Sequence, residues 1–71
     1  MSASDIARRH YQSALQDGAA QAIKADAIAR AMLSLAIATF LEARPVDDVR
    51  GELLAAAENV DPDTDYMFMR P

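Results

Sequence analysis

Three aspartates near the end of the sequence have the spacing with which a calcium-binding loop presents its first ligands. Asp61, Asp63 and Asp65 stand at alternate positions, and the first carboxylates of such a loop alternate in the same way. The loop also needs a glycine at its sixth position for a sharp turn, and here that position holds Tyr66. We therefore interpret the aspartates as a solvated acidic turn around Pro62 and expect no calcium site.

Other catalytic or metal-binding chemistry has few residues to use. The sequence contains no cysteine and a single histidine, His10, so it offers neither a thiolate zinc site nor a Cys–His pair. The two glycines, Gly18 and Gly51, are isolated and form no glycine-rich phosphate-binding loop. The serines have no base close to them in sequence. We expect a protein that is not an enzyme and that requires no cofactor and no metal.

The segment Arg8–Tyr11 is the one cluster of basic and aromatic residues. Arginines can bind phosphates and a tyrosine ring can stack on a base. On a helix, however, Arg8, Arg9 and Tyr11 point in different directions, and Asp5 lies one turn before both arginines. The net charge of −4 also disfavours a polyanionic partner, and residues 45–65 carry seven acids against Arg50 alone. A small nucleic-acid-associated regulator that uses Arg8–Tyr11 is thus the alternative function.

The length of 71 residues allows one domain with a small core. A core of this size rarely contributes more than about 3–5 kcal/mol, so small folds usually add a disulfide, a metal or a partner. Sixteen residues are alanine, which favours helix but buries little surface. Without cysteines, oligomerisation is the expected source of additional stability. The excess of alanine, and of arginine over lysine, suggests a GC-rich bacterial genome.

Nothing in the sequence indicates export or membrane insertion. Met1–Ile6 lacks a basic start followed by an apolar run, so no signal peptide is expected. The longest uncharged stretch, Ala31–Leu41, has eleven residues, well short of the ~20 that span a bilayer. We expect a cytoplasmic protein with no membrane partner.

Sequence signals predict where the first helix starts and ends. A first helix is predicted from Ser4 to Gln16, with Ser2 and Asp5 at capping-box spacing and Ser4 as an alternative N-cap. The pair Asp17-Gly18 is expected to end it. A helix that continued through Gly18 would lose only about 1 kcal/mol, so this break is the weakest boundary in the prediction.

Two more helices and a tail complete the predicted organisation. The second helix is expected from Ala19 to Ala43, where Pro45 ends it, and the third from Val46 to Asn59. The fold class is therefore all-α: a short three-helix bundle with a long central helix that self-associates. Residues 1–60 form the three-helix domain, and residues 61–71 form an acidic and then apolar C-terminal tail, expected to be docked.

The second helix has apolar residues on too much of its surface for one neighbour to cover. They spread over roughly 240° of its circumference, whereas a surface helix usually shows a stripe little wider than about 100°. The third helix can cover one side, and a second copy of the chain is the economical cover for the other. The predicted self-association residues are Ile28, Met32, Leu33, Leu35, Ile37, Phe40 and Leu41.

The tail contains four consecutive apolar residues that are the predicted docking or partner-binding segment: Tyr66, Met67, Phe68 and Met69. Methionine and aromatic side chains suit an apolar groove, which could lie in the same subunit, in a neighbouring subunit or in another protein. Together these features predict a non-catalytic protein–protein interaction module. It would be a small regulator, adaptor or inhibitor that acts as a helical homodimer and binds a further, unidentified protein.

Overall fold

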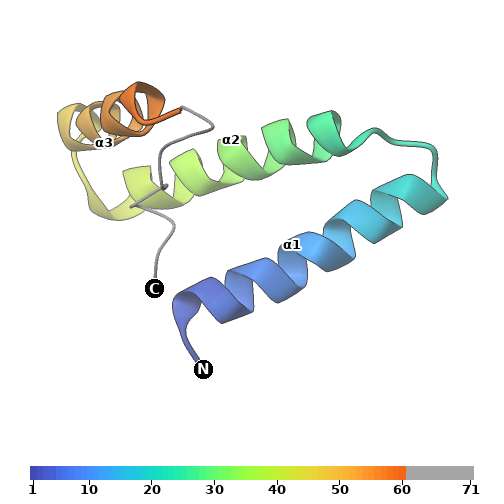
Figure 1. Ribbon diagram of the computed structural model, residues 1–71. Helices are drawn as coiled ribbons and strands as arrows, with labels where there is room; N and C mark the ends of the chain where they lie inside the picture. The colour runs from blue at the N-terminus through green and yellow to red at the C-terminus, as the bar shows by residue number, and fades with distance from the viewer. Residues whose placement is uncertain (61–71) are drawn as a thin grey trace. The chain divides into compact units, whose positions relative to one another are not determined.

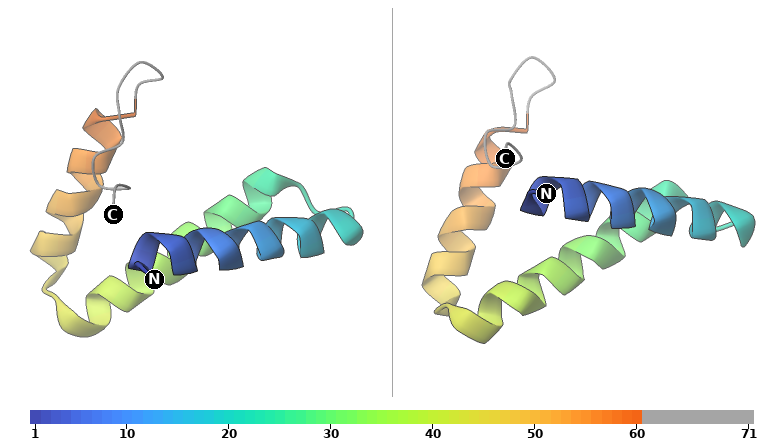
Figure 2. Two further views of the ribbon diagram at one scale, coloured as in Figure 1. Left: turned by 60° about the horizontal axis from the view of Figure 1, so that its bottom comes forward. Right: turned by 90° about the horizontal axis from the view of Figure 1, so that it is seen from below.

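A computed structural model of the protein describes residues 1–60, which form three α-helices and no strand (Figures 1 and 2). The helices are α1 (Ala3–Ala20), α2 (Ala25–Ala43) and α3 (Val46–Glu58). The predicted all-α class is confirmed for this part of the chain. The chain divides into two compact units. The first runs to Ala36 and holds α1 with the beginning of α2, and the second starts at Ile37 and holds the rest of α2 with α3.

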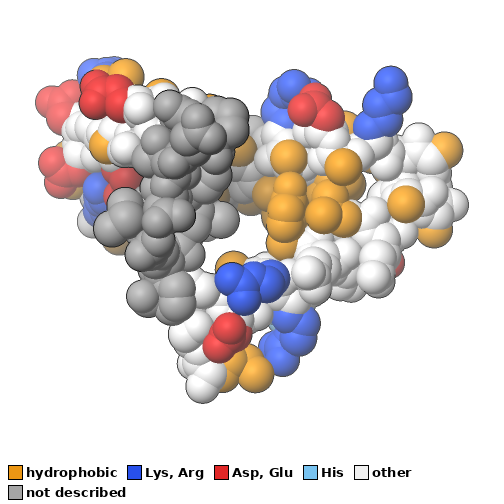
Figure 3. Space-filling view, viewed as in Figure 1, with side chains coloured by type: hydrophobic (Ala, Val, Ile, Leu, Met, Phe, Trp, Pro, Cys, Tyr) orange, Lys and Arg blue, Asp and Glu red, His pale blue; other side chains and the backbone are white. Residues whose placement is uncertain are grey.

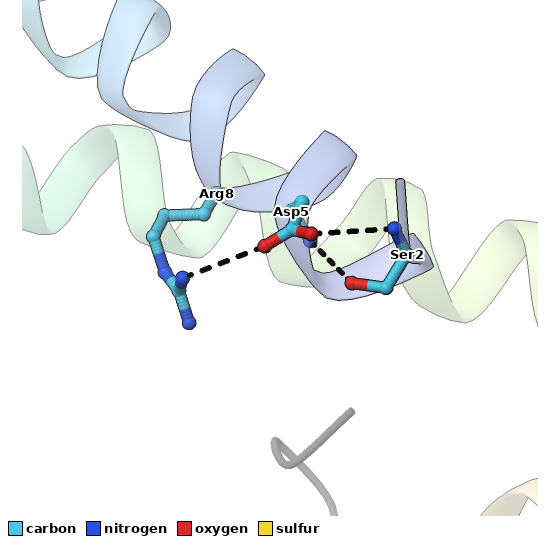
Figure 4. Close-up of polar contacts among 3 residues, drawn as sticks. All are labelled: Ser2, Asp5 and Arg8. Carbon is cyan, nitrogen blue, oxygen red and sulfur yellow. Dashed lines mark hydrogen bonds and ion pairs between the residues drawn. The ribbon is translucent and has the colours of Figure 1, made fainter.

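The start of α1 is fixed by the predicted capping box (Figure 4). The backbone N–H of Asp5 donates to Ser2 Oγ at 3.1 Å, and the backbone N–H of Ser2 donates to Asp5 Oδ2 at 3.3 Å. These reciprocal bonds satisfy two donors that helix geometry leaves without partners. Ser2, and not Ser4, is therefore the N-cap.

The predicted break at Asp17-Gly18 is wrong, because α1 continues through Gly18 to Ala20. Gly18 is buried, and a Cβ atom added to it would lie 2.9 Å from Cγ1 of Ile28. The missing side chain lets Ile28 of α2 approach the backbone of α1. The second helix consequently begins at Ala25 rather than Ala19. It has 19 residues, only one more than the 18 of α1. The expected 25-residue helix does not form.

The turn after α1 contains a non-glycine residue in the left-handed region, Ala22, with φ of 62°. The N–H of Ile23 donates to the carbonyl of Gly18 at 2.8 Å, and the N–H of Ala22 donates to the carbonyl of Ala19 at 3.1 Å. This pair of bonds is the Schellman motif, in which the left-handed position is usually glycine. Alanine there makes the turn strained.

Replacing Ala22 with glycine should therefore stabilise the protein. The left-handed conformation costs an L-residue roughly 1–2 kcal/mol, and the greater freedom of glycine in the unfolded chain cancels part of the gain. We expect a net increase of about 0.5–1 kcal/mol in the free energy of unfolding, measured by urea denaturation. The control is Ala20→Gly within α1, which should lower stability by about 1 kcal/mol. Equal losses from both substitutions would contradict the prediction.

The second unit contains the corner between α2 and α3, whose boundaries agree with the sequence signals. α2 ends at Ala43, and the carbonyl of Pro45 accepts from the N–H groups of Asp48 and Val49 at 3.1 and 3.2 Å. Asn59 is the C-cap of α3, and its Nδ2 donates to the carbonyl of Ala55 at 2.8 Å. The third helix is thus one residue shorter than predicted, with Asn59 capping it as expected.

Few side chains are buried in the described part of the chain. Val49, with 3% of its surface exposed, is the buried hydrophobic residue among residues 1–60, and α2 contains no buried residue. Several large apolar side chains are more than two-fifths exposed. No helix in this range combines the length and apolar character needed to cross a membrane. Large apolar side chains thus remain exposed on the described helices.

Candidate interaction surface

The seven residues predicted for self-association all lie on α2, where hydrophobic side chains gather on the face seen in Figure 3. Their exposure differs. Leu33, Leu35 and Leu41 are 54%, 64% and 45% exposed. The other four are half-buried: Ile28, Met32, Ile37 and Phe40. The three leucines therefore form the accessible part of the predicted surface.

Helix periodicity separates the seven residues into two stripes, because only residues three, four or seven positions apart share a side of a helix. The first, here called the Leu35 stripe, contains Ile28, Met32 and Leu35. The second, the Leu41 stripe, contains Leu33, Ile37, Phe40 and Leu41. The third helix is expected to cover one side of this surface and a second copy the other. Two residues of the Leu41 stripe, Ile37 and Leu41, line a groove beside α3, whereas no residue of the Leu35 stripe does.

The Leu41 stripe leads into an apolar groove in the second unit. The groove is open, has a volume of about 300 Å³ and lies between the end of α2 and the side of α3. Its lining is aliphatic except for one arginine: Ile37, Leu41, Val46, Val49, Arg50, Leu53 and Leu54. Three of these side chains, Leu41, Val46 and Leu54, are 45–58% exposed. Only Val49, at the base of the groove, is buried.

Arg44 links α2 to α3. Its Nη1 donates to Glu52 Oε1 in an ion pair, and its Nη2 donates to the backbone carbonyl of Asp48 at 3.3 Å. Its guanidinium also lies 5.2 Å from the centre of the Phe40 ring, within the range of a cation–π contact. Sequence reasoning did not single out Arg44. The signal that could have found it is the Glu52 carboxylate on the other side of Pro45.

Replacing Arg44 with alanine should lower the free energy of unfolding by about 1 kcal/mol. A partly exposed ion pair contributes about 0.2–1 kcal/mol and an exposed cation–π contact about 0.5–1 kcal/mol. Part of the loss should disappear at high salt, because ions screen the pair. Thermal denaturation at low and high salt measures both effects.

The matched control for Arg44 is Arg30→Ala. Arg30 pairs with Asp26 within α2 at 2.9 Å, but both side chains are more than 70% exposed. Such a pair contributes about 0.3–0.5 kcal/mol. If the Arg44 and Arg30 variants lost equal stability, Arg44 would not be the link between the two helices.

The Arg8–Tyr11 segment lies on α1, in the first unit. Arg8 pairs with Asp5, Nη1 to Oδ1, at 3.9 Å (Figure 4). Arg9 and His10 are exposed, whereas Tyr11 is half-buried. The segment thus combines a paired arginine with a partly covered ring, and this arrangement gives no specific support to the nucleic-acid alternative.

Two sets of predicted residues, Asp61–Asp65 and Tyr66–Met69, lie outside the described residues. Within residues 1–60, no three histidine, aspartate or glutamate side chains converge closely enough to hold a metal ion.

Comparison of the chain with protein-family models, with curated proteins and with solved structures finds no match. Function is therefore inferred from the Leu35 stripe and the groove. Apolar helix faces and grooves are recurring sites of helix and peptide binding.

Proposed function

We propose that this chain is a non-catalytic protein–protein interaction module, a small regulator, adaptor or inhibitor that acts as a helical homodimer. The dimer contact is Leu35, the exposed residue of the Leu35 stripe, because Ile28 of the same stripe already packs against Gly18 of α1. The groove supports a binding role rather than catalysis, because its lining consists of aliphatic side chains and Arg50 and presents no nucleophile or base.

The observation that carries the proposal is the small amount of buried apolar surface. Ordering a residue costs about 1–2 kcal/mol in backbone entropy alone, and burial of a large apolar side chain returns about 1.5–3 kcal/mol. Val49 is the buried hydrophobic residue of the described range, and its other large apolar side chains are half-buried or exposed. Burial within residues 1–60 therefore returns only part of what apolar side chains could contribute. A partner that covers Leu33, Leu35 or Leu41 supplies the missing burial.

A second copy is the simplest such partner for the Leu35 stripe. In a two-fold dimer the same face serves both subunits, so Leu35 would pack beside its symmetry mate. Ala31 and Ala38 lie one turn before and one turn after Leu35, and both are exposed. Small side chains at these positions let two helices approach closely, which favours an α2–α2 contact.

Light scattering of the wild-type protein over a wide range of concentrations tests the proposal. We expect a mass of twice the 7.7 kDa chain, or a multiple of that dimer, at high concentration. Dilution should shift the population toward the monomer and lower the melting temperature, because assembly and stability are coupled. A well-folded monomer at every concentration would contradict the homodimer and leave the stripe to a different protein.

A further inference from the structure

We propose that the groove between α2 and α3 is the docking site of the chain's own Tyr66–Met69 segment, which folds back from the end of α3. This inference goes beyond self-association, because it assigns the groove to a segment of the same chain. It uses the Leu41 stripe, whereas the proposed dimer uses the Leu35 stripe.

The groove has room for the aromatic residues of the segment. A closed apolar cavity of about 150 Å³ accepts a benzene molecule, so a groove of about 300 Å³ offers space for two rings. Tyr66 and Phe68 are two positions apart. In an extended backbone such residues point to the same side, so both rings can enter the groove together.

The chain between α3 and the segment is long enough to return to the groove. Residues 61–65 separate Val60 from Tyr66, and an extended chain covers about 3.3–3.6 Å per residue, or roughly 20 Å over this distance. The groove is lined on α3 by residues from Val46 to Leu54. Leu54 is about 9 Å from Val60 along a helix axis, and Val49 about 17 Å.

The charges at the groove also match the segment. Arg50 is the basic residue in the groove lining, and Asp65 immediately precedes Tyr66. Arg50 already pairs with Asp47, Nη1 to Oδ1, at 3.2 Å, but both side chains are more than 60% exposed. A guanidinium has five N–H donors, so it can bind a second carboxylate. Asp65 is adjacent to Tyr66 in sequence, so a docked Tyr66 would keep this carboxylate near the groove that Arg50 lines.

Covalent attachment favours the chain's own segment over other occupants. A short flexible connection keeps a tethered group at an effective concentration in the millimolar range. A second copy or a foreign peptide at micromolar concentration must therefore bind much more tightly to displace it.

A tryptophan reporter tests the docking in the full-length protein. The chain contains no tryptophan, so Phe68→Trp gives a single emission signal from the segment. We expect blue-shifted emission and protection from an aqueous quencher. In the Phe68→Trp background, the additional substitution Leu54→Asp places a charge in the groove. The emission should then shift to that of exposed tryptophan. Leu54 is 58% exposed, so the fold should tolerate this change, which circular dichroism verifies. Val46→Asp is the second groove variant.

The control is Leu35→Glu, which lies outside the groove and should leave the emission blue-shifted. Light scattering of the same samples separates the two proposals. If Leu35→Glu dissociates the dimer but leaves the tryptophan emission blue-shifted, self-association and tail docking are independent. Exposed emission from both Phe68→Trp and Tyr66→Trp would overturn the docking. Blue emission that survives both groove variants would place the segment elsewhere and also overturn it. A blue shift that disappears on dilution, together with the dimer, would assign the groove to the tail of a second copy and overturn docking within one chain.

Discussion

Replacing Leu35 with glutamate should convert the protein to a monomer. Leu35 is 64% exposed, so its removal takes little packing from the isolated chain. In a two-fold interface the substitution removes two buried leucines and places two carboxylates side by side. Loss of two leucine contacts at about 1.5–3 kcal/mol each weakens the dimer by roughly two to four powers of ten in Kd. Light scattering or sedimentation at several concentrations measures the change.

Leu33→Glu provides a matched control for this result. Leu33 lies on the same helix with a similar exposure of 54%, but it belongs to the Leu41 stripe. The Leu33 variant should therefore remain a dimer. If Leu33→Glu dissociated the protein while Leu35→Glu did not, the dimer would form through the other stripe. If neither substitution changed the mass, α2 would not be the interface.

Gly18→Ala and Gly51→Ala should change stability in opposite directions. Alanine is about 1 kcal/mol more favourable than glycine inside a helix, and both glycines are helical. A Cβ at Gly51 meets no atom within 4 Å, so this variant should gain about 0.5–1 kcal/mol. A Cβ at Gly18 would lie 2.9 and 3.1 Å from Cγ1 and Cδ1 of Ile28. Overpacking of this kind costs about 1–3 kcal/mol, which outweighs the gain and leaves a net loss.

The free energies of unfolding of the two glycine variants, obtained from urea denaturation, test this contrast. Ile28→Ala provides the matched check, because it removes the atoms that a Cβ at Gly18 would meet. In the Ile28→Ala background, Gly18→Ala should become neutral or stabilising. An increase in stability from Gly18→Ala in the wild-type background would show that α1 and α2 do not pack through Gly18.

The sequence predicted the helices best where local chemistry determines their ends. Ser2 and Asp5 satisfy each other's backbone groups, Pro45 forms the corner after α2, and Asn59 caps α3. Each of these interactions involves residues within a few positions of one another, so their types and spacing were sufficient evidence. The three-helix, strand-free organisation of residues 1–60 follows from these signals and from the apolar periodicity.

The prediction failed where a contact with another helix determines the local structure. Gly18 looked like a helix end because glycine is common there, but its function is to admit Ile28 from the next helix. α1 ends at Ala20, and the turn after it, where Ala22 is left-handed, contains no glycine and no proline. The helix end predicted from residue propensities is therefore four residues too early. Packing against another helix outweighs the propensity of glycine to end a helix.

The seven residues predicted for self-association stay a prediction. The structure shows that three of them, Leu33, Leu35 and Leu41, are exposed. The groove was missed as a feature, although Val46, Val49, Leu53 and Leu54 are apolar at helical spacing on α3. A groove depends on how closely two helices approach at a corner, and the contacts of Arg44 with Glu52 and Phe40 that hold this corner are not visible in a list of residue types.

The links within each unit have a consequence for folding kinetics. Ile28 meets Gly18 across one short turn, and Arg44 meets Glu52 across another, eight residues apart in sequence. Helical proteins held together by contacts this local typically fold in microseconds to milliseconds, because little loop-closure entropy must be lost before the contacts form. Typical protein association proceeds at about 10⁵–10⁷ M⁻¹ s⁻¹. At micromolar concentration two chains therefore meet on a timescale of roughly 0.1–10 s. If the chains form the proposed dimer, the contacts between neighbouring helices should form first, and association should limit the rate of assembly.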